Sequence, residues 1–526
     1  MKKIIVCDAI HQKGLDILEA CLDVEFIDAS KESKDKLLEI VGEYDVAITR
    51  SSTDVDQKFI EKATNITSIV RAGVGVDNVD IEGCSKKGIV VMNVPTANTI
   101  AAVELTMAHL LSSARSFPNA NNHLKYDRIW KREKWYGIEL KGKKLGVIGF
   151  GNIGSRVSKR ALAFEMEVIA YDPYIDSSRA LDSGVGYTSN FDDILDCDFI
   201  TIHTPKNKET IDMINFEEIE KMKDGVRLIN CARGGLYNED ALYNGLKSGK
   251  IAYAGIDVFT KEPAVDNKLL ELDNISVTPH LGANTVESQQ KIAIEAAEQA
   301  ISAAKGISYP NALNLAYKES ELPQFVKPFL LLAGKMGYLA SQINLGHVKS
   351  IKVIAEGEIS NYLEPLITFA LVGSLKESMG EMINYVNADF VAKEKSILIQ
   401  GIKEANRSEY KNKIQIALTT DKDYVLIGGT VFDEEIEKIV HVNKIKLDFK
   451  PKGRMIFFSN SDKPGVIANI SKALTEHNIN IADFRLGRGE HGNAFAVVVV
   501  DEAVSKDVLR KLESIENCNK VAYATL

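Results

Sequence analysis

Short apolar runs, many of them rich in valine and isoleucine, recur through the first part of the chain, separated by longer stretches with apolar residues at helical spacing. Runs of this kind suit buried strands of a parallel sheet. Their alternation with helices is typical of doubly wound α/β units. The runs cover residues 4–6, 46–48, 69–70, 89–91, 144–148, 168–171, 199–202, 226–229 and 275–278.

Two such units are predicted, with a long helix on either side of the second. An apolar stripe marks a helix at 99–115 that leads into the second unit, and an alanine-rich helix at 286–305 returns the chain to the first. The pattern therefore predicts one domain made of 1–98 and 285–314, into which a second domain, 99–284, is inserted. A ligand would bind in the cleft between them, at the carboxyl ends of the strands.

Two further regions follow. Prolines and asparagines between 306 and 323 indicate a linker, and residues 315–450 mix helices with strands. Residues 451–526 read strand, helix, strand, strand, helix, strand, which is the ferredoxin-like order. The predicted fold class is therefore α/β, with two doubly wound parallel-sheet domains followed by an α+β domain and a ferredoxin-like domain.

A glycine-rich turn gives the second unit its first chemical meaning. Residues 149–154 read Gly-Phe-Gly-Asn-Ile-Gly between a predicted strand and a predicted helix, and Asp172 ends the next strand. This is a dinucleotide-binding fingerprint in its full context, which makes the second unit Rossmann-like. The first unit is predicted to be flavodoxin-like. The Asp172 carboxylate can accept hydrogen bonds from an adenosine ribose and would repel a 2′-phosphate, so NAD is favoured over NADP. The fingerprint glycines are Gly149, Gly151 and Gly154.

Composition and charge argue against several classes of protein. The chain has 526 residues, 45% hydrophobic and 26% charged, which suits a globular protein of several domains. A net charge of −9 argues against non-specific binding to nucleic acid or to anionic membranes. Six cysteines without a CxxC pair fit reduced thiols in a cytoplasm, and no metal site is expected. The longest apolar runs have the length of strands, far below a membrane span.

Three polar segments of the second unit follow apolar runs. They contain Arg233, Glu262 and His280. Because the carboxyl ends of parallel strands meet at one sheet edge, we expect these side chains where the cofactor lies. Oxidation of a hydroxyl by NAD needs a general base for the hydroxyl proton, and a substrate that bears a carboxylate needs a cation.

The order of these motifs resembles the D-isomer-specific 2-hydroxyacid dehydrogenases. Besides the fingerprint, the motifs are Asn230-Cys-Ala-Arg-Gly-Gly235, Lys261-Glu-Pro263 and Pro279-His-Leu-Gly-Ala283. Within that superfamily, Arg71-Ala-Gly-Val-Gly-Val-Asp-Asn-Val-Asp80 and Asn93-Val-Pro-Thr-Ala-Asn98 resemble the D-3-phosphoglycerate dehydrogenases. The resemblance is strong over residues 1–314 and weaker beyond. It implies an intervening (allosteric substrate-binding) domain at 315–450 and an ACT regulatory domain at 451–526.

The resemblance also implies roles for single residues. His280 would take the proton of the substrate's C2 hydroxyl, Glu262 would fix the histidine tautomer, and Arg233 would bind the substrate carboxylate or polarise its carbonyl. Backbone amides of Gly73 and Val74 would face the same carboxylate. The NAD pocket would be lined by Asn152, Ile153, Asp172, Thr204, Cys231, Asp257 and Ala283.

A phosphorylated hydroxy acid needs further cations. Arg50 and Arg71 are the candidates, and Arg132 resembles a residue that the family supplies from the neighbouring subunit. Because exposed arginines usually face solvent, a plain surface role stays open for Arg50 and Arg132. Cys231 is expected to contact the cofactor without acting as a nucleophile, and His203 is expected in the core.

The last region points to control. ACT domains pair side by side between subunits and hold an amino acid at the shared edge, and Asn460, Asp462 and Asn480 match effector-contacting positions. Some relatives have asparagine where this chain has Asp462. The effector could therefore be L-serine or another ligand, or the domain could serve only in assembly. The resemblance gives no ligand for the intervening domain.

The resemblance implies NAD-dependent oxidation of 3-phospho-D-glycerate to 3-phosphohydroxypyruvate, the first step of L-serine biosynthesis, by a cytoplasmic homo-oligomer (dimer or tetramer). Another D-2-hydroxyacid dehydrogenase, such as a glyoxylate or hydroxypyruvate reductase, is the near alternative. An NAD-sensing, corepressor-like binding protein is the alternative from another class. The subunit number, the direction of flux and any side activity on 2-oxoglutarate stay open.

Overall fold

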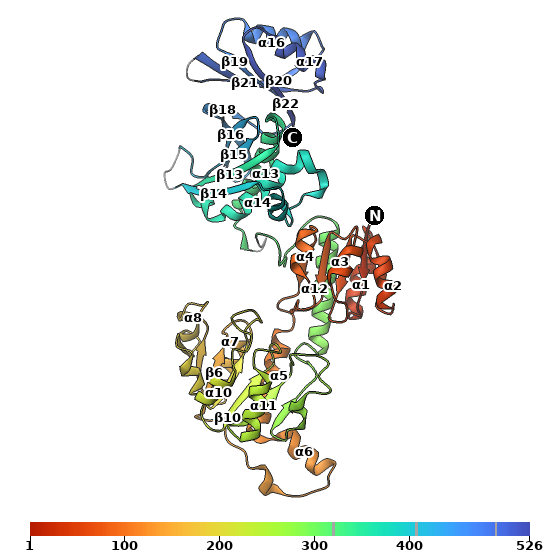
Figure 1. Ribbon diagram of the computed structural model, residues 1–526, viewed down its shortest axis with the longest axis vertical. Helices are drawn as coiled ribbons and strands as arrows, with labels where there is room; N and C mark the ends of the chain where they lie inside the picture. Colours follow the sequence, from red (N-terminus) through yellow and green to blue (C-terminus); the bar gives the residue numbers. More distant parts are fainter. Residues whose placement is uncertain (318–320, 405–408, 490–491) are drawn as a thin grey trace.

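The computed structural model describes residues 1–317, 321–404, 409–489 and 492–526. These residues form four sheets with their helices, placed one after another along the long axis of the molecule (Figure 1). The second α/β unit lies at one end, followed by the first unit, the intervening region and the C-terminal unit. Spatial order differs from chain order because helix α12 (Val286–Ala304) carries the chain back to the first unit.

The first unit is a parallel sheet in the order β2-β1-β3-β4-β5, with one apolar core on each face. Its central strand β3 is buried along its whole length because helices cover both faces. Helix α12 packs on α1, β3 and β4, and Asn314 then bonds to the backbone of Ile89 and Val91 beside β5. The elements are β1 (Lys2–Val6), α1 (Gln12–Ala20), β2 (Val24–Asp28), α2 (Lys34–Ile40), β3 (Val46–Thr49), α3 (Gln57–Lys62), β4 (Ser68–Arg71), α4 (Ile81–Lys86) and β5 (Val90–Asn93).

The second unit is a parallel sheet in the order β12-β11-β10-β9-β6-β7-β8. The chain enters at β6, runs outward to β8 and returns to β9, so the strand order reverses between β6 and β9. Doubly wound folds bind ligands at such a point, outside the carboxyl ends of the strands. The strands are β6 (Lys144–Ile148), β7 (Glu167–Tyr171), β8 (Gly186–Thr188), β9 (Phe199–Ile202), β10 (Val226–Asn230), β11 (Ile251–Ile256) and β12 (Ile275–Val277).

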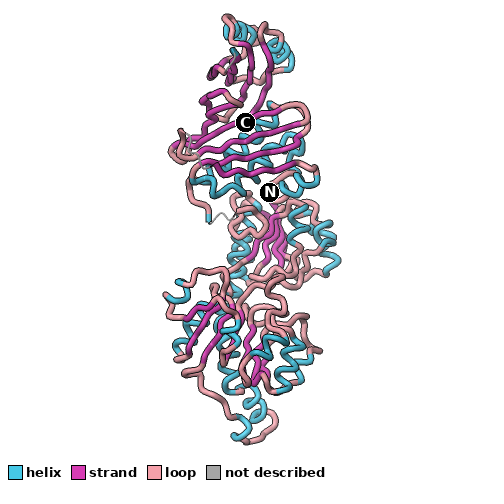
Figure 2. The backbone as a smooth tube through the Cα atoms, turned by 60° about the vertical axis from the view of Figure 1, so that its left-hand side comes forward, coloured by secondary structure: helices cyan, strands magenta, loops and turns pink. Residues whose placement is uncertain are grey.

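Helices cover both faces of this second sheet (Figure 2). Helix α5 packs on β10 and β11 and joins the two units, while α6 lies in an arm at the far end of the molecule (Figure 1). The helices are α5 (Thr99–Arg115), α6 (Phe117–Lys125), α7 (Gly154–Ala163), α8 (Ser178–Leu181), α9 (Asp192–Leu195), α10 (Phe216–Lys221) and α11 (Glu239–Ser248).

The intervening region is a mixed sheet in the order β14-β13-β15-β16-β17-β18. Helices α13 and α14 cross so closely that a Cβ on Gly373 would collide with the carbonyl oxygen of Gly334. The Asn384 side chain donates to the carbonyl oxygen of Gly88 at 2.8 Å and so contacts the first unit. The elements are α13 (Val326–Ile343), β13 (Val348–Glu356), α14 (Leu363–Met379), α15 (Ala388–Glu394), β14 (Leu398–Glu404), β15 (Lys413–Thr420), β16 (Tyr424–Phe432), β17 (Ile436–Val442) and β18 (Ile445–Phe449).

The C-terminal unit has an antiparallel sheet in the order β20-β21-β19-β22 with two helices, which confirms the ferredoxin-like prediction. Its elements are β19 (Arg454–Ser461), α16 (Val466–Thr475), β20 (Ile481–Arg488), β21 (Asn493–Val500), α17 (Lys506–Glu513) and β22 (Cys518–Thr525). Among the described residues, no helix is both long and apolar enough to cross a membrane.

The predicted fold class is confirmed, but in the two α/β units the apolar pattern missed strands β2 and β8, whereas the apolar run expected before the Glu262 segment is β11. Strands β2 and β8 lie next to only one neighbour each and expose part of their length, so they lack a continuous apolar run. Strand β11 contains Gly255, where a Cβ would lie 2.7 Å from the Cβ of His109 on α5. Close approach of helix to sheet therefore requires glycine there.

Candidate active site

A cleft of ≈ 380 Å³ lies between the two α/β units, at the point where the strand order reverses. The first unit contributes the loop after β4, and the second contributes the glycine turn and the segments after β9, β10 and β12. The predicted site residues along the cleft are Val74, Asn152, Ile153, Thr204, Cys231, Arg233, His280 and Ala283. The structure thus brings together groups that are far apart in the chain.

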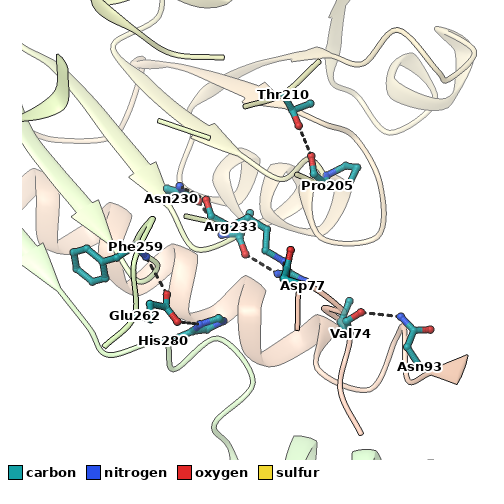
Figure 3. Close-up of polar contacts among 11 residues, drawn as sticks. Val74, Asp77, Asn93, Pro205, Thr210, Asn230, Arg233, Phe259, Glu262 and His280 are labelled. Carbon is teal, nitrogen blue, oxygen red and sulfur yellow. Dashed lines mark hydrogen bonds and ion pairs between the residues drawn. The ribbon is translucent and has the colours of Figure 1, made fainter. Parts of the chain in front are cut away.

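His280 and Glu262 form a close pair at this cleft. The Nδ1 atom of His280 lies 2.8 Å from Oε2 of Glu262, while Oε1 of Glu262 accepts a hydrogen bond from the Phe259 amide at 3.0 Å (Figure 3). Glu262 lies in a second hollow beside the cleft, and His280 lines both spaces. The carboxylate therefore contacts the imidazole at Nδ1, and Nε2 is the ring nitrogen that does not contact Glu262.

The pair shifts both pKa values. The hydrogen bond from His280 to Glu262 raises the pKa of His280 above its usual value of 6.5, although burial opposes this. Burial also works against ionisation of Glu262, but its hydrogen bonds to His280 and Phe259 outweigh burial and lower its pKa. The histidine is therefore a stronger base than a free imidazole, and its protonated form has an anionic partner.

The loop that carries His280 is held from below by Asp257, which is fully buried. Its carboxylate accepts hydrogen bonds from the Thr278 hydroxyl at 2.6 Å, the Leu281 amide at 2.7 Å and the Gly282 amide at 2.9 Å. These bonds support the left-handed backbone of His280, whose φ is 54°. Asp257 does not line the cleft, and its contact with the cofactor stays a prediction.

Arg233 reaches the cleft from the end of β10. Asn230 fixes its turn by donating to the carbonyl oxygen of Arg233 at 2.9 Å and accepting from the Ala232 amide at 3.0 Å. Nη1 of the guanidinium donates to the Ala232 carbonyl at 2.7 Å, and Nε lies 3.3 Å from Oδ2 of Asp77 (Figure 3). Asp77 belongs to the first unit, so this ion pair spans the cleft.

Arg50 and Arg71 lie beside the cleft but do not line it. Arg50 donates to the Ala9 carbonyl at 2.9 Å and to the Gln289 side chain at 2.8 Å. Burial, with the charges of Arg233 and Arg50, lowers the pKa of Arg71 to about 10. The three guanidiniums are therefore close enough to interact, with the carboxylates of Asp77 and Asp8 beside them.

The loop after β4 differs from its expected form in one respect. The Gly73 amide donates to the Arg71 carbonyl at 2.8 Å, so it is already engaged. Glycine is needed here because its φ is +155° and a Cβ would collide with the Arg71 guanidinium. The Val74 carbonyl accepts a bond from Asn93 at 2.7 Å, which holds the loop in place (Figure 3).

The glycine turn has the shape that a pyrophosphate needs. Gly149 has a φ of +87°, and a Cβ on Gly154 would collide with the carbonyl oxygen of Gly149. Nothing lies within 4 Å of the Cβ position of Gly151. Asp172 accepts hydrogen bonds from the Phe150 amide at 2.9 Å and the Tyr174 amide at 3.0 Å.

Three family models match successive parts of the chain. Residues 107–282 match the NAD binding domain of D-isomer specific 2-hydroxyacid dehydrogenases, residues 325–443 the D-3-phosphoglycerate dehydrogenase intervening domain, and residues 454–517 the ACT domain. D-3-phosphoglycerate dehydrogenases of Archaeoglobus fulgidus and Bacillus subtilis are 38% and 37% identical to this chain, and each alignment covers 100% of both chains. The chain belongs to the D-3-phosphoglycerate dehydrogenase family.

Solved structures agree with this assignment over the two α/β units. The D-lactate dehydrogenase of Aquifex aeolicus, complexed with NAD and lactic acid, is 30% identical with a TM-score of 0.52. The TT0316 protein of Thermus thermophilus is 30% identical with a TM-score of 0.55. Each match covers 59% of this chain and 99% of the other. This member of the D-3-phosphoglycerate dehydrogenase family is thus an NAD-dependent dehydrogenase with two added C-terminal domains.

The residues of this dehydrogenase at the cleft fit NAD. Thr204 Oγ1 and His203 Nδ1 are buried without a hydrogen-bond partner among the described residues, and both residues line the cleft. His203, which is expected in the core, thus also lines the cleft. Among the described residues, the two oxygens of Asp172 accept only two backbone bonds, which leaves acceptor sites for a ribose. Burial raises the pKa of the Cys231 thiol, which suits a contact residue and not a nucleophile.

Sequence reasoning missed several residues that shape the site. Three of them, Asp77, Asn93 and Asn230, lie in the sequence motifs but were given no role of their own. Each bonds to an expected site residue. His109 on α5 bonds to the hydroxyls of Ser276 and Thr278 at 2.9 Å each and so ties α5 to the His280 loop. An asparagine at the end of a buried strand, as Asn230 is in β10, is the signal that could have indicated a turn-fixing role.

Arg132 and the effector residues lie away from the cleft. Arg132 stands in an exposed turn, Arg132–Trp135, in the arm that carries α6. In the ACT domain, Asn460 and Asp462 line a hollow of ≈ 300 Å³, where Asp462 Oδ2 lies 3.1 Å from Nε of Arg488. Asn480 does not line this hollow, and its side chain donates to Asp501 at 2.7 Å.

Proposed function

We propose that the chain oxidises the C2 hydroxyl of 3-phospho-D-glycerate with NAD, giving 3-phosphohydroxypyruvate, the first step of L-serine biosynthesis. The observation that carries this proposal is that His280, paired with Glu262, lines the same cleft as Arg233 and the glycine turn. The full-length likeness to D-3-phosphoglycerate dehydrogenases supports the choice of substrate.

The residues divide the chemistry between them. NAD, which the glycine turn and Asp172 would hold, would supply the acceptor for the hydride of C2. His280 takes the hydroxyl proton at Nε2, the nitrogen that does not contact Glu262, and the carboxylate at Nδ1 stabilises the resulting imidazolium. Arg233 binds the carboxylate of the substrate and polarises the carbonyl that forms at C2. Asp257 keeps the His280 loop in its strained conformation.

Replacement of His280 by alanine tests the catalytic part. Turnover should fall by about 10²–10⁴ because the general base is lost, whereas NAD affinity should stay unchanged. Absorbance of reduced nicotinamide follows turnover, and fluorescence titration follows cofactor binding. His477→Ala, in the ACT domain, is the matched control. Near-normal turnover of His280→Ala would refute the role of the base.

The substrate class has its own test. Another 2-hydroxyacid dehydrogenase activity is the second candidate, because neither Arg50 nor Arg71 lines the cleft. If the three-guanidinium region serves a phosphate, kcat/KM for 3-phosphoglycerate should exceed that for unphosphorylated glycerate, and Arg71→Gln should remove most of the difference. Equal values for the two substrates would favour a glyoxylate or hydroxypyruvate reductase.

Assembly and control complete the proposal. The arm around α6 exposes large apolar side chains, which suits burial in a cytoplasmic homo-oligomer where Arg132 serves the neighbouring site. These side chains are Phe117, Tyr126, Trp130 and Tyr136. L-serine is the proposed effector, at the hollow of the ACT domain that Asn460 and Asp462 line. Sedimentation tests the assembly, and assays of wild type and Asp462→Ala with added L-serine test the effector site.

A further inference from the structure

The ion pair between Arg233 and Asp77 joins the two sides of the active-site cleft. Nε of Arg233 lies 3.3 Å from Oδ2 of Asp77, and the two side chains are 26% and 64% exposed (Figure 3). The guanidinium belongs to the cofactor-binding unit and the carboxylate to the loop after β4. The Asp77 carboxylate therefore already pairs with the Arg233 guanidinium, to which the proposed function assigns the carboxylate of the substrate.

The remaining contacts of Arg233 show which edge of its guanidinium a substrate carboxylate would share with Asp77. Nη1 donates to the backbone carbonyl of Ala232 at 2.7 Å, so that corner is engaged by the protein. A Cβ on Gly75 would lie 2.6 Å from Nη2 of Arg233 and 3.0 Å from Oδ2 of Asp77. Nη2 and the Asp77 oxygen thus lie over the same glycine. A carboxylate that binds two-pronged to Nε and Nη2 would need the space where Asp77 lies.

A second acid near the arginines behaves differently. Asp8 is 7% exposed, and its carboxylate accepts bonds from the Thr53 hydroxyl at 2.9 Å and from the Arg50 amide. Asp8 is therefore fixed. Asp77 has most of its side chain in solvent and can rotate away at little cost, because an exposed ion pair contributes little to stability.

We propose that Asp77 is an internal competitor for the substrate carboxylate at Arg233 and thereby sets the affinity of the site for 2-hydroxy acids. This inference rests on the proposed function, because it takes Arg233 as the carboxylate-binding cation. A substrate carboxylate displaces Asp77 from the Nε and Nη2 edge, and Asp77 turns into solvent. Like-charge repulsion would disfavour both carboxylates together at that edge.

The kinetic consequence is a split between KM and kcat. Asp77→Asn keeps the size of the side chain but removes its charge, so the substrate no longer competes for Arg233. KM for 3-phosphoglycerate should fall about two- to fivefold, the range of an exposed ion pair. The kcat should stay unchanged, since Asp77 has left the guanidinium before the chemical step.

Asp54→Asn is the matched control. Asp54 is 61% exposed, lies in the same unit and pairs with Lys34 at 3.8 Å, so its loss changes net charge equally without touching Arg233. Full-length wild type, Asp77→Asn and Asp54→Asn are compared for KM and kcat. Oxalate, a small carboxylate probe without phosphate, is titrated calorimetrically into each protein with NADH present.

The outcomes separate the two proposals. A lower KM and tighter oxalate binding in Asp77→Asn alone support the competitor role. A KM that is unchanged or raised in Asp77→Asn would overturn it, and a raised KM with a lower kcat would make Asp77 a positioning residue for Arg233. If wild type oxidises no 2-hydroxy acid, the proposed function fails. The oxalate titration then still decides whether Asp77 competes for Arg233.

Discussion

Replacement of Glu262 by glutamine perturbs one charge and almost no volume. Both oxygens of Glu262 accept hydrogen bonds, one from His280 Nδ1 at 2.8 Å and one from the Phe259 amide at 3.0 Å. A glutamine side chain has only one oxygen, so one of these donors would face the new NH2 group. Loss of a charge-assisted hydrogen bond costs about 1.5–3 kcal/mol, which corresponds to a fall in kcat/KM of about 10- to 150-fold.

The pH dependence makes this prediction specific. The general base acts only when neutral, and the bond to Glu262 raises the pKa of His280 above 6.5, so wild-type oxidation should increase as pH rises through that raised value. In Glu262→Gln the main cause of the raised His280 pKa is lost, while burial still lowers this pKa. The acid limb of the kcat/KM profile should therefore move below pH 6.5. The kcat/KM of the variant should fall furthest below that of wild type at pH values above the wild-type pKa of His280, and the difference should become smaller at acid pH.

The assay is the pH profile of kcat/KM from absorbance of reduced nicotinamide. Glu239→Gln is the matched control, because Glu239 accepts from the Thr260 amide and from Asn267 but has no contact with His280. An acid limb at the same pH in Glu262→Gln and wild type would refute the reasoning, and so would an unchanged kcat/KM at alkaline pH.

Three further predictions follow from close contacts. Gly154→Ala should abolish NAD binding in fluorescence titrations because its Cβ would strike the glycine turn, whereas Gly151→Ala, with open space at its Cβ, should not distort the turn. Asp257→Asn should lower kcat about tenfold or more and reduce the melting temperature, because a single amide oxygen cannot replace two carboxylate oxygens that accept three bonds. Gly88→Ala should destabilise the protein by about 1–3 kcal/mol in denaturant melts, because its φ is +78° and its Cβ would lie 2.6 Å from Nδ2 of Asn384.

Much of the fold could be predicted because its signals are local. The helix predicted at 99–115 matches α5, and the one at 286–305 ends one residue beyond α12. Not every apolar residue of helix α5 is buried, since Ile100 and Leu111 are 46% and 38% exposed. Periodicity gives the existence of an apolar face, but the neighbouring sheet decides which positions it covers.

The candidate site is a different case, because its motifs identify segments and not contacts. Asp257 and His280 both follow apolar strands and both match family positions, yet one carboxylate lies wholly under a loop while the imidazole faces the cleft. Three donors converge on Asp257 from residues 278–282, and that convergence depends on the pairing of β11 with β12. A residue that supports a catalytic loop and a residue that touches a ligand carry the same sequence signal. Only the spatial placement of their hydrogen-bond partners separates them, and this is why Asp77 could emerge as a competitor for Arg233 only after the two units were placed against each other.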